Sequence, residues 1–154
     1  MKPGFFERGG WWVLGQSVLM PLVVALGPLT AGDWRWPGPG FIAWALLALG
    51  AFFGVGGAWV LGRNRTIFPH PNEGSRLVRH GVYRFVRHPL YASLVWLSAG
   101  WGLLWRSWPT LLAGLALTVF LIFKSRHEER WLRAHFPEYA EYARRVRRLI
   151  PWVY

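Results

Sequence analysis

Residues 90–123, LYASLVWLSAGWGLLWRSWPTLLAGLALTVFLIF, decide the fold of this chain. The stretch is almost wholly apolar and divides into runs at residues 90–105 and 109–123, with a short break at residues 105–109 that contains Arg, Ser and Pro. Such a break between apolar runs is typical of a tight turn. The segment therefore predicts two antiparallel helices in a compact hairpin, so the outer ends of the two runs, at Leu90 and Phe123, come together.

Two further apolar runs precede this hairpin, and they indicate a membrane protein. The 154 residues are 53% hydrophobic, include 12 Trp and no Cys, and concentrate their apolar residues in blocks rather than on one helical face. A membrane span needs roughly 20 residues at a rise of about 1.5 Å per residue, which the runs at residues 11–29 and 41–61 provide. We read the first run as a retained span rather than a signal peptide, because it is long and no Ala-x-Ala site follows it.

The predicted fold class is an all-α integral membrane protein with four transmembrane helices, a tight C-terminal helical hairpin and a cytoplasmic amphipathic helical tail. The tail prediction rests on a helix that continues from Phe123 to His135 and on a second helix over residues 137–149, whose apolar face would lie on the inner leaflet. We predict a single domain over residues 1–154, made of two N-terminal spans (1–61), a cytoplasmic loop (62–89), the hairpin (90–123) and the tail (124–154).

The distribution of charge predicts the topology. The formal net charge is +11, and with four spans all but two of the 18 basic residues, Arg35 and Arg106, fall on the side of the termini and the loop. The positive-inside rule then places both termini and residues 62–89 in the cytoplasm, in a multi-pass protein of the cell (inner) membrane. The arginines are expected to contact anionic lipid headgroups of the bilayer and not nucleic acid. A stripe of small residues at Gly50, Gly54, Ala58 and Gly62 permits close helix packing and leaves an oligomer possible.

Two clusters of ionisable residues border the hairpin and predict a functional site. Arg84, Arg87 and His88 precede its first helix, while Lys124, Glu128 and Glu129 follow its second. Ionisable groups at the mouths of membrane segments are costly to desolvate and usually mark function. For Arg87, His88, Tyr91, Glu128 and Glu129 together we favour a shared pocket over simple ion pairing at the membrane surface.

Several other site classes lack support in the sequence. There is no Gly-rich dinucleotide or phosphate loop, no Ser nucleophile elbow and no Cys pair. His127 and His135 lie eight residues apart without a His-Glu-x-x-His pattern, so no metal site is predicted.

The order of motifs resembles the isoprenylcysteine carboxyl methyltransferase family, and the related phospholipid N-methyltransferases share its Arg-His-Pro and Glu-Glu elements. The motifs are Gly81-x-Tyr83-x-x-x-Arg87-His88-Pro89-x-Tyr91, then Glu128-Glu129-x-x-Leu132, then Phe136-x-x-Tyr139-x-x-Tyr142-x-x-x-Val146 and Pro151. They cover residues 75–151, about half of the chain. Two positions depart from the family pattern, Ser93 and Pro137, each where Gly is common, and Ser93 is expected to alter the shape of the pocket.

The resemblance implies an enzyme, a methyltransferase that uses S-adenosylmethionine, with a cofactor pocket built by the last spans and the tail. Carried over by position, Lys124 would contact the substrate. The residues implied to bind the cofactor are Ser75, Arg76, Leu77, Val78, Tyr83, His88, Pro89, Leu90, Tyr91 and Glu128.

The chemistry of the residues is consistent with methyl transfer. Arg87 would orient a substrate carboxylate or the cofactor, and Glu129 would stabilise the cationic centre or assist proton removal, so Arg87, Glu129 and Lys124 are the predicted catalytic residues. A lipophilic substrate would enter from the membrane, and the cofactor from the cytoplasm.

The alternatives are methylation of phosphatidylethanolamine or of another small lipophilic molecule, a nicotinamide-dependent membrane reductase, and a membrane protein without catalytic activity. The identity of the acceptor stays open at this point.

Overall fold

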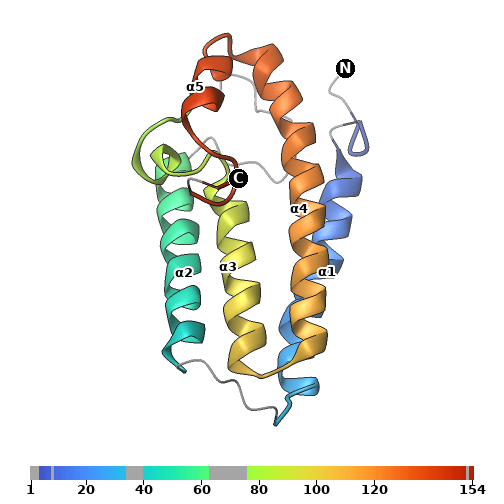
Figure 1. The fold of residues 1–154 in the computed structure, drawn as a ribbon. Helices are drawn as coiled ribbons and strands as arrows, with labels where there is room; N and C mark the ends of the chain where they lie inside the picture. Colours follow the sequence, from blue (N-terminus) through green and yellow to red (C-terminus); the bar gives the residue numbers. More distant parts are fainter. Residues whose placement is uncertain (1–3, 8, 34–39, 63–75, 152) are drawn as a thin grey trace.

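The fold was analysed in a computed structural model, which describes all residues except 1–3, 8, 34–39, 63–75 and 152. In these described residues the regular structure consists of five α-helices and one short 3-10 helix (Figure 1). Within the described residues the only β-type pairing is an isolated bridge between Val86 and Arg147. The helices are α1 (Gly10–Leu29), α2 (Phe41–Leu61), η2 (Gly81–Arg84), α3 (Pro89–Leu104), α4 (Trp108–His135) and α5 (Tyr139–Arg145).

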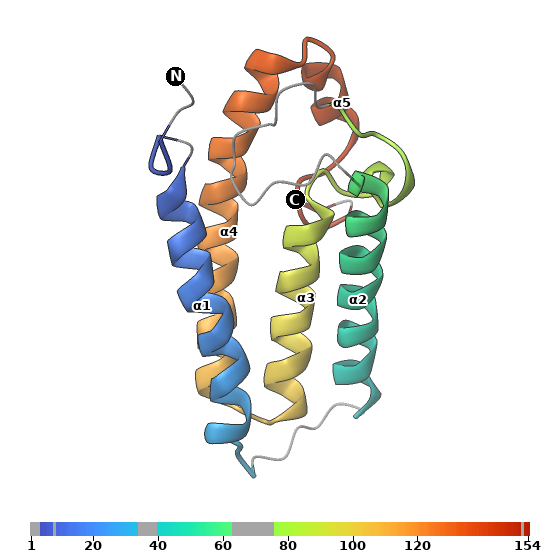
Figure 2. The same ribbon diagram turned by 180° about the vertical axis from the view of Figure 1, so that it is seen from behind.

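The four long helices run alternately up and down, as Figures 1 and 2 show from opposite sides. α2 packs along α3, α1 packs along α4, and α3 also contacts both α4 and α1. This order brings the start of α1, the segment before α3, and α5 to one end of the bundle. The candidate site lies at this end.

Three of the four expected spans are long and apolar enough to cross a membrane. They are α1, α2 and α4, with 20, 21 and 28 residues. α3 is apolar but has only 16 residues, which at about 1.5 Å per residue is shorter than the roughly 20 residues of a usual span. The described residues therefore form an all-helical structure with three candidate membrane spans, and the count of four transmembrane helices stays a prediction.

The small residues of α2 allow α3 to approach it closely. A Cβ atom at Gly50 would lie 2.7 Å from Leu97 Cγ, and one at Gly54 would lie 2.6 Å from Ser93 Oγ. Ser93 is 5% exposed and packs here against α2 rather than lining the candidate site. The expected effect of Ser93 on the shape of the pocket is therefore not direct, and the Gly50 and Gly54 positions of the stripe serve packing within the chain.

The turn between α3 and α4 lies where the sequence predicts it. Ser107 caps α4 by accepting a hydrogen bond from the Thr110 N–H at 3.1 Å, and its hydroxyl lies 2.6 Å from Thr30 Oγ1 at the end of α1. Arg106 takes a positive φ of 52°, a left-handed conformation that closes the turn. The hairpin is thereby fixed to α1 at the end opposite the candidate site.

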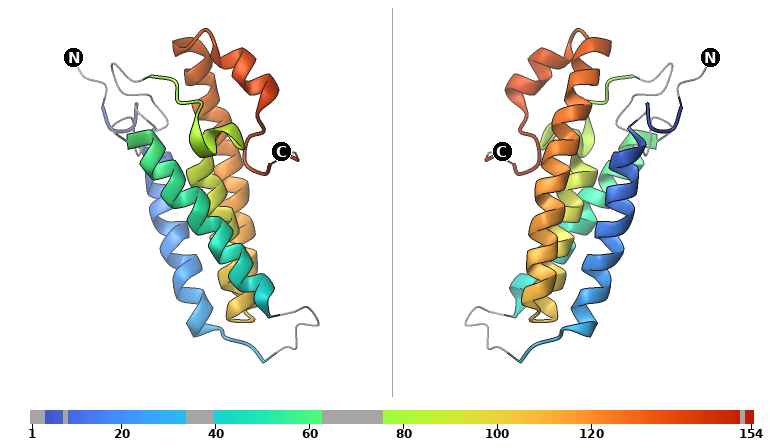
Figure 3. Two further views of the ribbon diagram at one scale, coloured as in Figure 1. Left: turned by 90° about the vertical axis from the view of Figure 1, so that its left-hand side faces the viewer. Right: turned by 90° about the vertical axis from the view of Figure 1, so that its right-hand side faces the viewer.

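The tail differs from its prediction. A single helix over residues 137–149 is wrong, because α5 ends at Arg145 and the chain then extends so that the Arg87 and His88 N–H groups donate to the Arg147 and Arg148 carbonyls at 2.8 and 3.1 Å. The apolar residues assigned to a lipid-facing surface are buried in protein instead: Tyr139 is 1% exposed and Leu149 is 2% exposed. Figure 3 shows α5 folded back beside the end of α4.

Candidate active site

The two predicted clusters meet at the end of the hairpin. Tyr91, in the first turn of α3, donates a hydrogen bond to Glu128 Oε2 on α4 at 2.9 Å. His88 bridges both glutamates, with its Nδ1 3.7 Å from Glu128 Oε2 and its Nε2 3.2 Å from Glu129 Oε1. The His88 ring also stacks on Tyr91, with centroids 5.4 Å apart. The sequence correctly predicted that the ends of the hairpin come together.

The adjacent residues Glu128 and Glu129 point to different surroundings. Successive side chains on an α-helix are rotated by about 100°, so two neighbours cannot share one face. The Glu128 side chain is 22% exposed and lines a cavity, whereas that of Glu129 is 2% exposed and takes no part in the lining. Glu129 instead accepts hydrogen bonds from the guanidinium groups of Arg87 and Arg148.

Arg87 and Arg148 connect the tail to the hairpin through Glu129. Arg87 also donates to two backbone carbonyls of the tail, those of Ala143 at 2.9 Å and of Val146. Arg148 binds both carboxylate oxygens of Glu129 at 2.9 Å, and the carboxylate raises the pKa of Arg148 above its ordinary value. Sequence reasoning missed Arg148, because its partner became visible only once the end of the tail was found to be extended.

The cavity at this end has an empty volume of about 840 Å³, part of it open to solvent. We call it the polar cavity. Nine of the ten residues implied to bind a cofactor line it, and the tenth, Ser75, lies outside the described residues. Of the predicted catalytic residues, only Arg87 lines the cavity. The complete lining is Leu61, Arg76, Leu77, Val78, Tyr83, Arg87, His88, Pro89, Leu90, Tyr91, Glu128, Leu132, Phe136, Tyr139 and Tyr142.

Two tyrosines of α5 complete the cavity wall, and the sequence analysis gave neither a role in the site. The Tyr142 hydroxyl donates to the Tyr83 carbonyl at 2.6 Å, which fixes α5 to η2. The Tyr139 hydroxyl is buried and has no hydrogen-bond partner among the described residues. Burial raises the pKa of each phenol well above its ordinary value, so both are neutral near pH 7. Their spacing of three residues put them on one face, but that face was assigned to lipid.

The predicted substrate contact, Lys124, lies outside the polar cavity. Its side chain is buried between α4 and α1, where Nζ donates to Gln16 Oε1 at 2.6 Å and lies 5.3 Å from the Tyr91 ring centroid. Gln16 is a second residue that sequence reasoning missed, since nothing in the pattern of the first apolar run relates it to the clusters.

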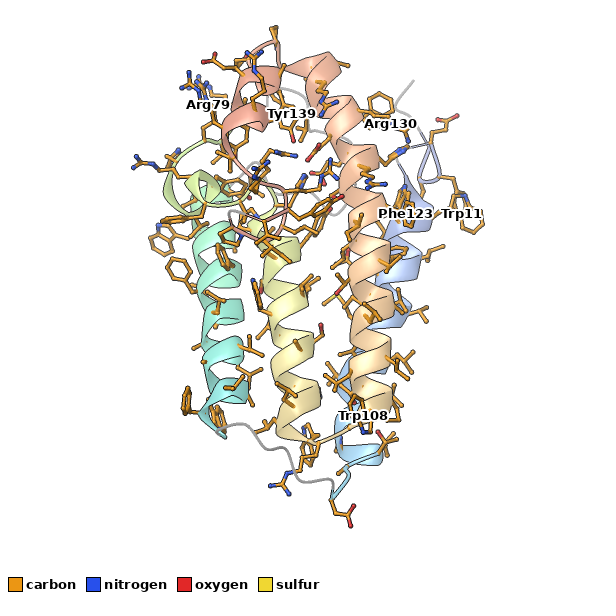
Figure 4. All side chains as sticks on the ribbon, viewed as in Figure 1. Trp11, Arg79, Trp108, Phe123, Arg130 and Tyr139 are labelled. Carbon is orange, nitrogen blue, oxygen red and sulfur yellow. The ribbon has the colours of Figure 1, made fainter. Side chains whose placement is uncertain are left out.

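Charged side chains gather at the end of the molecule that holds the cavity. Figure 4 shows Arg79, Arg130 and Tyr139 at this end, with side chains that are mostly carbon along the helices and Trp108 at the far end. Within the described residues, no group of three or more His, Asp or Glu side chains is placed to hold a metal ion. The site therefore offers hydrogen bonds, charge and apolar walls.

Comparisons with known proteins identify the family of the chain. The family model described as phospholipid methyltransferase matches residues 40–139, which include α2, the hairpin and the start of α5. The chain belongs to the phospholipid methyltransferase family. The resemblance inferred from the Arg-His-Pro and Glu-Glu motifs is confirmed, and the chain is a methyltransferase-family membrane protein.

Individual relatives carry two kinds of name. A probable protein-S-isoprenylcysteine O-methyltransferase of Oryza sativa subsp. indica is 35% identical over 86 residues, which are 54% of this chain and 45% of the relative. Protein-S-isoprenylcysteine O-methyltransferase B of Arabidopsis thaliana is 34% identical over 53% of this chain and 42% of its own length. The cobalt-zinc-cadmium resistance protein CzcN of Cupriavidus metallidurans is 35% identical over 145 residues, which are 93% of this chain and 62% of that protein.

The chain thus spans between about two fifths and two thirds of the length of these relatives. The alignments with the plant methyltransferases cover only about half of this chain, whereas the alignment with the resistance protein covers 93% of it.

Proposed function

We propose that this chain is an S-adenosylmethionine-dependent methyltransferase that acts on a lipophilic acceptor at the cytoplasmic face of the cell membrane. The observation that carries the proposal is the polar cavity, in which Glu128 and Tyr91 from the two motifs share one wall. Family membership supports methyl transfer, and the distribution of the arginines supports the cytoplasmic placement.

The residues of the polar cavity fit the chemical groups of S-adenosylmethionine. Glu128 offers carboxylate oxygens to ribose hydroxyls, and Leu77, Val78 and Leu132 offer apolar walls to an adenine ring. The buried Tyr139 hydroxyl, which has no partner in the described part of the chain, offers a hydrogen bond to a ligand. A buried hydroxyl without a hydrogen-bond partner costs free energy. A ligand that forms a hydrogen bond with it removes this cost, and its binding becomes more favourable.

We assign different tasks to the two glutamates. Glu128 would bind the ligand, held in place by the Tyr91 hydroxyl. Glu129 is occupied by Arg87 and Arg148, and so it would act as a positioning residue that keeps the tail closed over the cavity. Neither assignment gives the reaction a strong general base, because His88 is already engaged with both carboxylates.

The cofactor would supply an electrophilic methyl group, and the protein would contribute alignment and exclusion of water. η2 and α5 close the polar cavity on the side away from the helices, and the Tyr142 hydroxyl holds them together. An acceptor that dissolves in the bilayer would reach the site between the helices. A carboxylate or thiolate acceptor suits a site without a free base better than a protonated amine does.

Ligand-dependent thermal stability of the purified protein in detergent tests this proposal. A ligand that binds only the native state raises its stability by RT ln(1 + [L]/Kd), or about 2.7 kcal/mol at a concentration of 100 Kd. We expect S-adenosylhomocysteine to stabilise the protein, and a reduced nicotinamide nucleotide to have no effect. Stabilisation by the nicotinamide alone would favour the reductase alternative, and stabilisation by neither ligand would refute the proposal.

A matched pair of variants places the ligand. Glu128→Gln removes one charge from the cavity wall, while Glu138→Gln removes one from an exposed position just before α5. Because a charge-assisted hydrogen bond contributes about 1.5–3 kcal/mol, we expect Glu128→Gln to weaken S-adenosylhomocysteine binding at least tenfold and Glu138→Gln to leave it unchanged. Equal affinities of the two variants for S-adenosylhomocysteine would show that Glu128 does not bind the ligand. Methyl transfer to a prenylated cysteine analogue and to phosphatidylethanolamine would then distinguish the two acceptor classes.

A further inference from the structure

A second cavity lies where the end of η2 meets the end of α5, and arginines form most of its wall. We call it the basic pocket. Its empty volume is about 600 Å³, part of it open to solvent. The lining residues are Arg84, Phe85, Arg144, Arg145, Val146 and Arg147. No described carboxylate takes part in this lining, and none of the six residues lines the polar cavity. The basic pocket is therefore a separate site that carries four positive charges.

Most of this charge is not balanced by the protein. Arg145 forms an ion pair with Glu141 at 2.6 Å. Among the described residues, no salt bridge joins Arg84, Arg144 or Arg147 to a carboxylate. A hollow lined by charges of one sign concentrates the electric field and attracts ions of the opposite sign. Because the planar guanidinium group matches the geometry of phosphate oxygens, the basic pocket suits a phosphate group.

The two walls of the basic pocket are fixed to each other by hydrogen bonds. The Arg87 N–H donates to the Arg147 carbonyl at 2.8 Å, and the Arg87 guanidinium donates to the Ala143 carbonyl at 2.9 Å. The Tyr142 hydroxyl donates to the Tyr83 carbonyl at 2.6 Å. The backbone that carries the arginines is thus in place before a ligand binds, which lowers the free-energy cost of ordering the site on binding.

The packing of η2 places the basic pocket at the level where a candidate membrane span ends. A Cβ atom at Gly56, near the end of α2, would lie 2.7 Å from Val82 Cγ1 of η2. Figures 1 and 2 show the segment before α3 beside this end of α2. Trp59 of α2 is 86% exposed, and Phe85 of the basic pocket is 48% exposed. Because exposed aromatic side chains are typical of the interface between membrane and water, the basic pocket is at the depth of lipid headgroups.

We propose that the basic pocket binds the phosphate group of an anionic phospholipid such as phosphatidylglycerol, with Phe85 against the apolar part of the lipid. The inference does not depend on methyl transfer. It assigns one site to the lipid, whereas the positive charge of the chain as a whole predicts only a general attraction to headgroups. Arg144, Arg145 and Arg147 follow residues 40–139, the part of the chain that matches the family model. A phosphate bound between η2 and these arginines would help to hold the tail closed over the polar cavity.

Equilibrium binding of three probes to the purified full chain in a neutral detergent tests the ligand class. The probes are radiolabelled dioleoylphosphatidylglycerol, dioleoylphosphatidylcholine, which has the same chains but no net charge, and glycerol 3-phosphate, which has no chains. An arginine near an anionic headgroup contributes about fivefold in affinity, so we expect phosphatidylglycerol to bind at least ten times more tightly than either of the others. Equal binding of phosphatidylcholine would overturn the charge preference. Equal binding of glycerol 3-phosphate would overturn the lipid as the occupant.

Two double variants that remove the same charge test the location of the site. Arg144→Gln/Arg147→Gln removes two positive charges from the basic pocket, and Arg126→Gln/Arg130→Gln removes two from exposed positions of α4 outside its lining. At about fivefold for each arginine, we expect the first variant to weaken phosphatidylglycerol binding by about 25-fold, and the second to leave it unchanged. Equal weakening by the two variants would show a general attraction of the lipid to positive charge and would overturn the site.

A conservative variant separates loss of charge from loss of structure. Arg144→Lys/Arg147→Lys keeps both positive charges, and lysine also binds phosphate, so we expect it to recover most of the affinity for phosphatidylglycerol. Binding as weak as in Arg144→Gln/Arg147→Gln would overturn an electrostatic site. S-adenosylhomocysteine binding, measured on the same preparations, reports on the proposed function: intact binding of this nucleotide with no preference for phosphatidylglycerol overturns only the present inference.

Discussion

The Arg148→Gln variant tests whether the extended tail is held over the site by a buried ion pair. Arg148 Nε and Nη2 each lie 2.9 Å from a different oxygen of Glu129, whose side chain is 2% exposed, and the Arg148 side chain is 16% exposed. The substitution removes both of these hydrogen bonds and the charge, and also the hydrogen bond that Arg148 Nη1 donates to the Tyr154 hydroxyl at 2.6 Å. It leaves Glu129 bound to Arg87 and His88, so the carboxylate does not become an isolated buried charge.

The size of the effect follows from these contacts. A hydrogen bond to a charged group contributes about 1.5–3 kcal/mol, and removal of one partner from a buried ion pair costs about 3–5 kcal/mol. Because Glu129 keeps Arg87, His88 and, at 3.7 Å, Arg133 as partners, and because Arg148 is partly exposed, we expect the free energy of unfolding to fall by about 2–3 kcal/mol. For a chain of this size, the midpoint of thermal unfolding would fall by roughly 5–10 °C.

Thermal unfolding in detergent and amide hydrogen exchange measure the two consequences. The Arg87 and His88 amides donate to the tail, so their exchange is expected to become faster in Arg148→Gln. The control is Arg145→Gln, which removes an ion pair with Glu141 whose side chains are 76% and 54% exposed. Such exposed pairs contribute about 0–1 kcal/mol. If the two variants unfold alike and exchange at the same rates, the buried pair does not hold the tail.

Three further variants test local features of the fold, each by thermal unfolding in detergent. Tyr142→Phe leaves a buried carbonyl of η2 without its donor and is expected to lower the free energy of unfolding by about 1–3 kcal/mol. Tyr139→Phe removes a hydroxyl that no described residue binds and should not destabilise the protein. Equal losses of stability in the two variants would contradict this contrast. Gly50→Ala forces a methyl group against α3 and is expected to cost about 1–3 kcal/mol. Gly40→Ala at the N-cap of α2 should cost less, because no atom lies within 4 Å of the added Cβ. Ser107→Ala removes the cap of α4 and is expected to cost about 1–2 kcal/mol; an unchanged midpoint would show that the cap does not stabilise the turn.

Much of the helical structure could be predicted because apolar runs in this chain end at residues that stop helices. The run at residues 41–61 became α2 with the same bounds, and the break at residues 105–109 became the turn after Leu104. Length and composition determine such elements locally. α3 was harder to classify, since a 16-residue apolar helix that packs on its neighbours has the same sequence pattern as a short membrane span.

The tail could not be predicted by the same reasoning. Tyr139, Tyr142 and Leu149 follow a helical spacing, which suggested one amphipathic helix. In the structure the Tyr142 hydroxyl bonds to the Tyr83 carbonyl, and residues 147–148 pair with residues 86–88. Both contacts join parts of the chain that are about 60 residues apart, and hydrophobic periodicity contains no information about them. Arg148 therefore read as one more surface arginine.

The candidate site was predicted in part. The sequence identified the segments that meet, because a tight hairpin forces its two outer ends together. It did not distinguish the roles of Glu128 and Glu129. It also did not connect Gln16 with Lys124, because the two residues are 108 positions apart and the pattern of the first apolar run does not indicate which helices α1 packs against.

The difference between the two glutamates has a consequence for how the site works. Because Glu128 and Glu129 are consecutive on one rigid helix, any movement of α4 that shifts one of them shifts the other. Glu129 is fixed by Arg87, which also binds two carbonyls of the tail. The closed tail therefore sets the position of Glu128 in the cavity wall, and a change in the tail is expected to shift the ligand site.

This reasoning predicts that Arg148→Gln also weakens S-adenosylhomocysteine binding, although Arg148 does not line the polar cavity. Arg145→Gln should not weaken it. An unchanged affinity in Arg148→Gln, together with the expected loss of stability, would show that Glu128 is positioned by α4 alone.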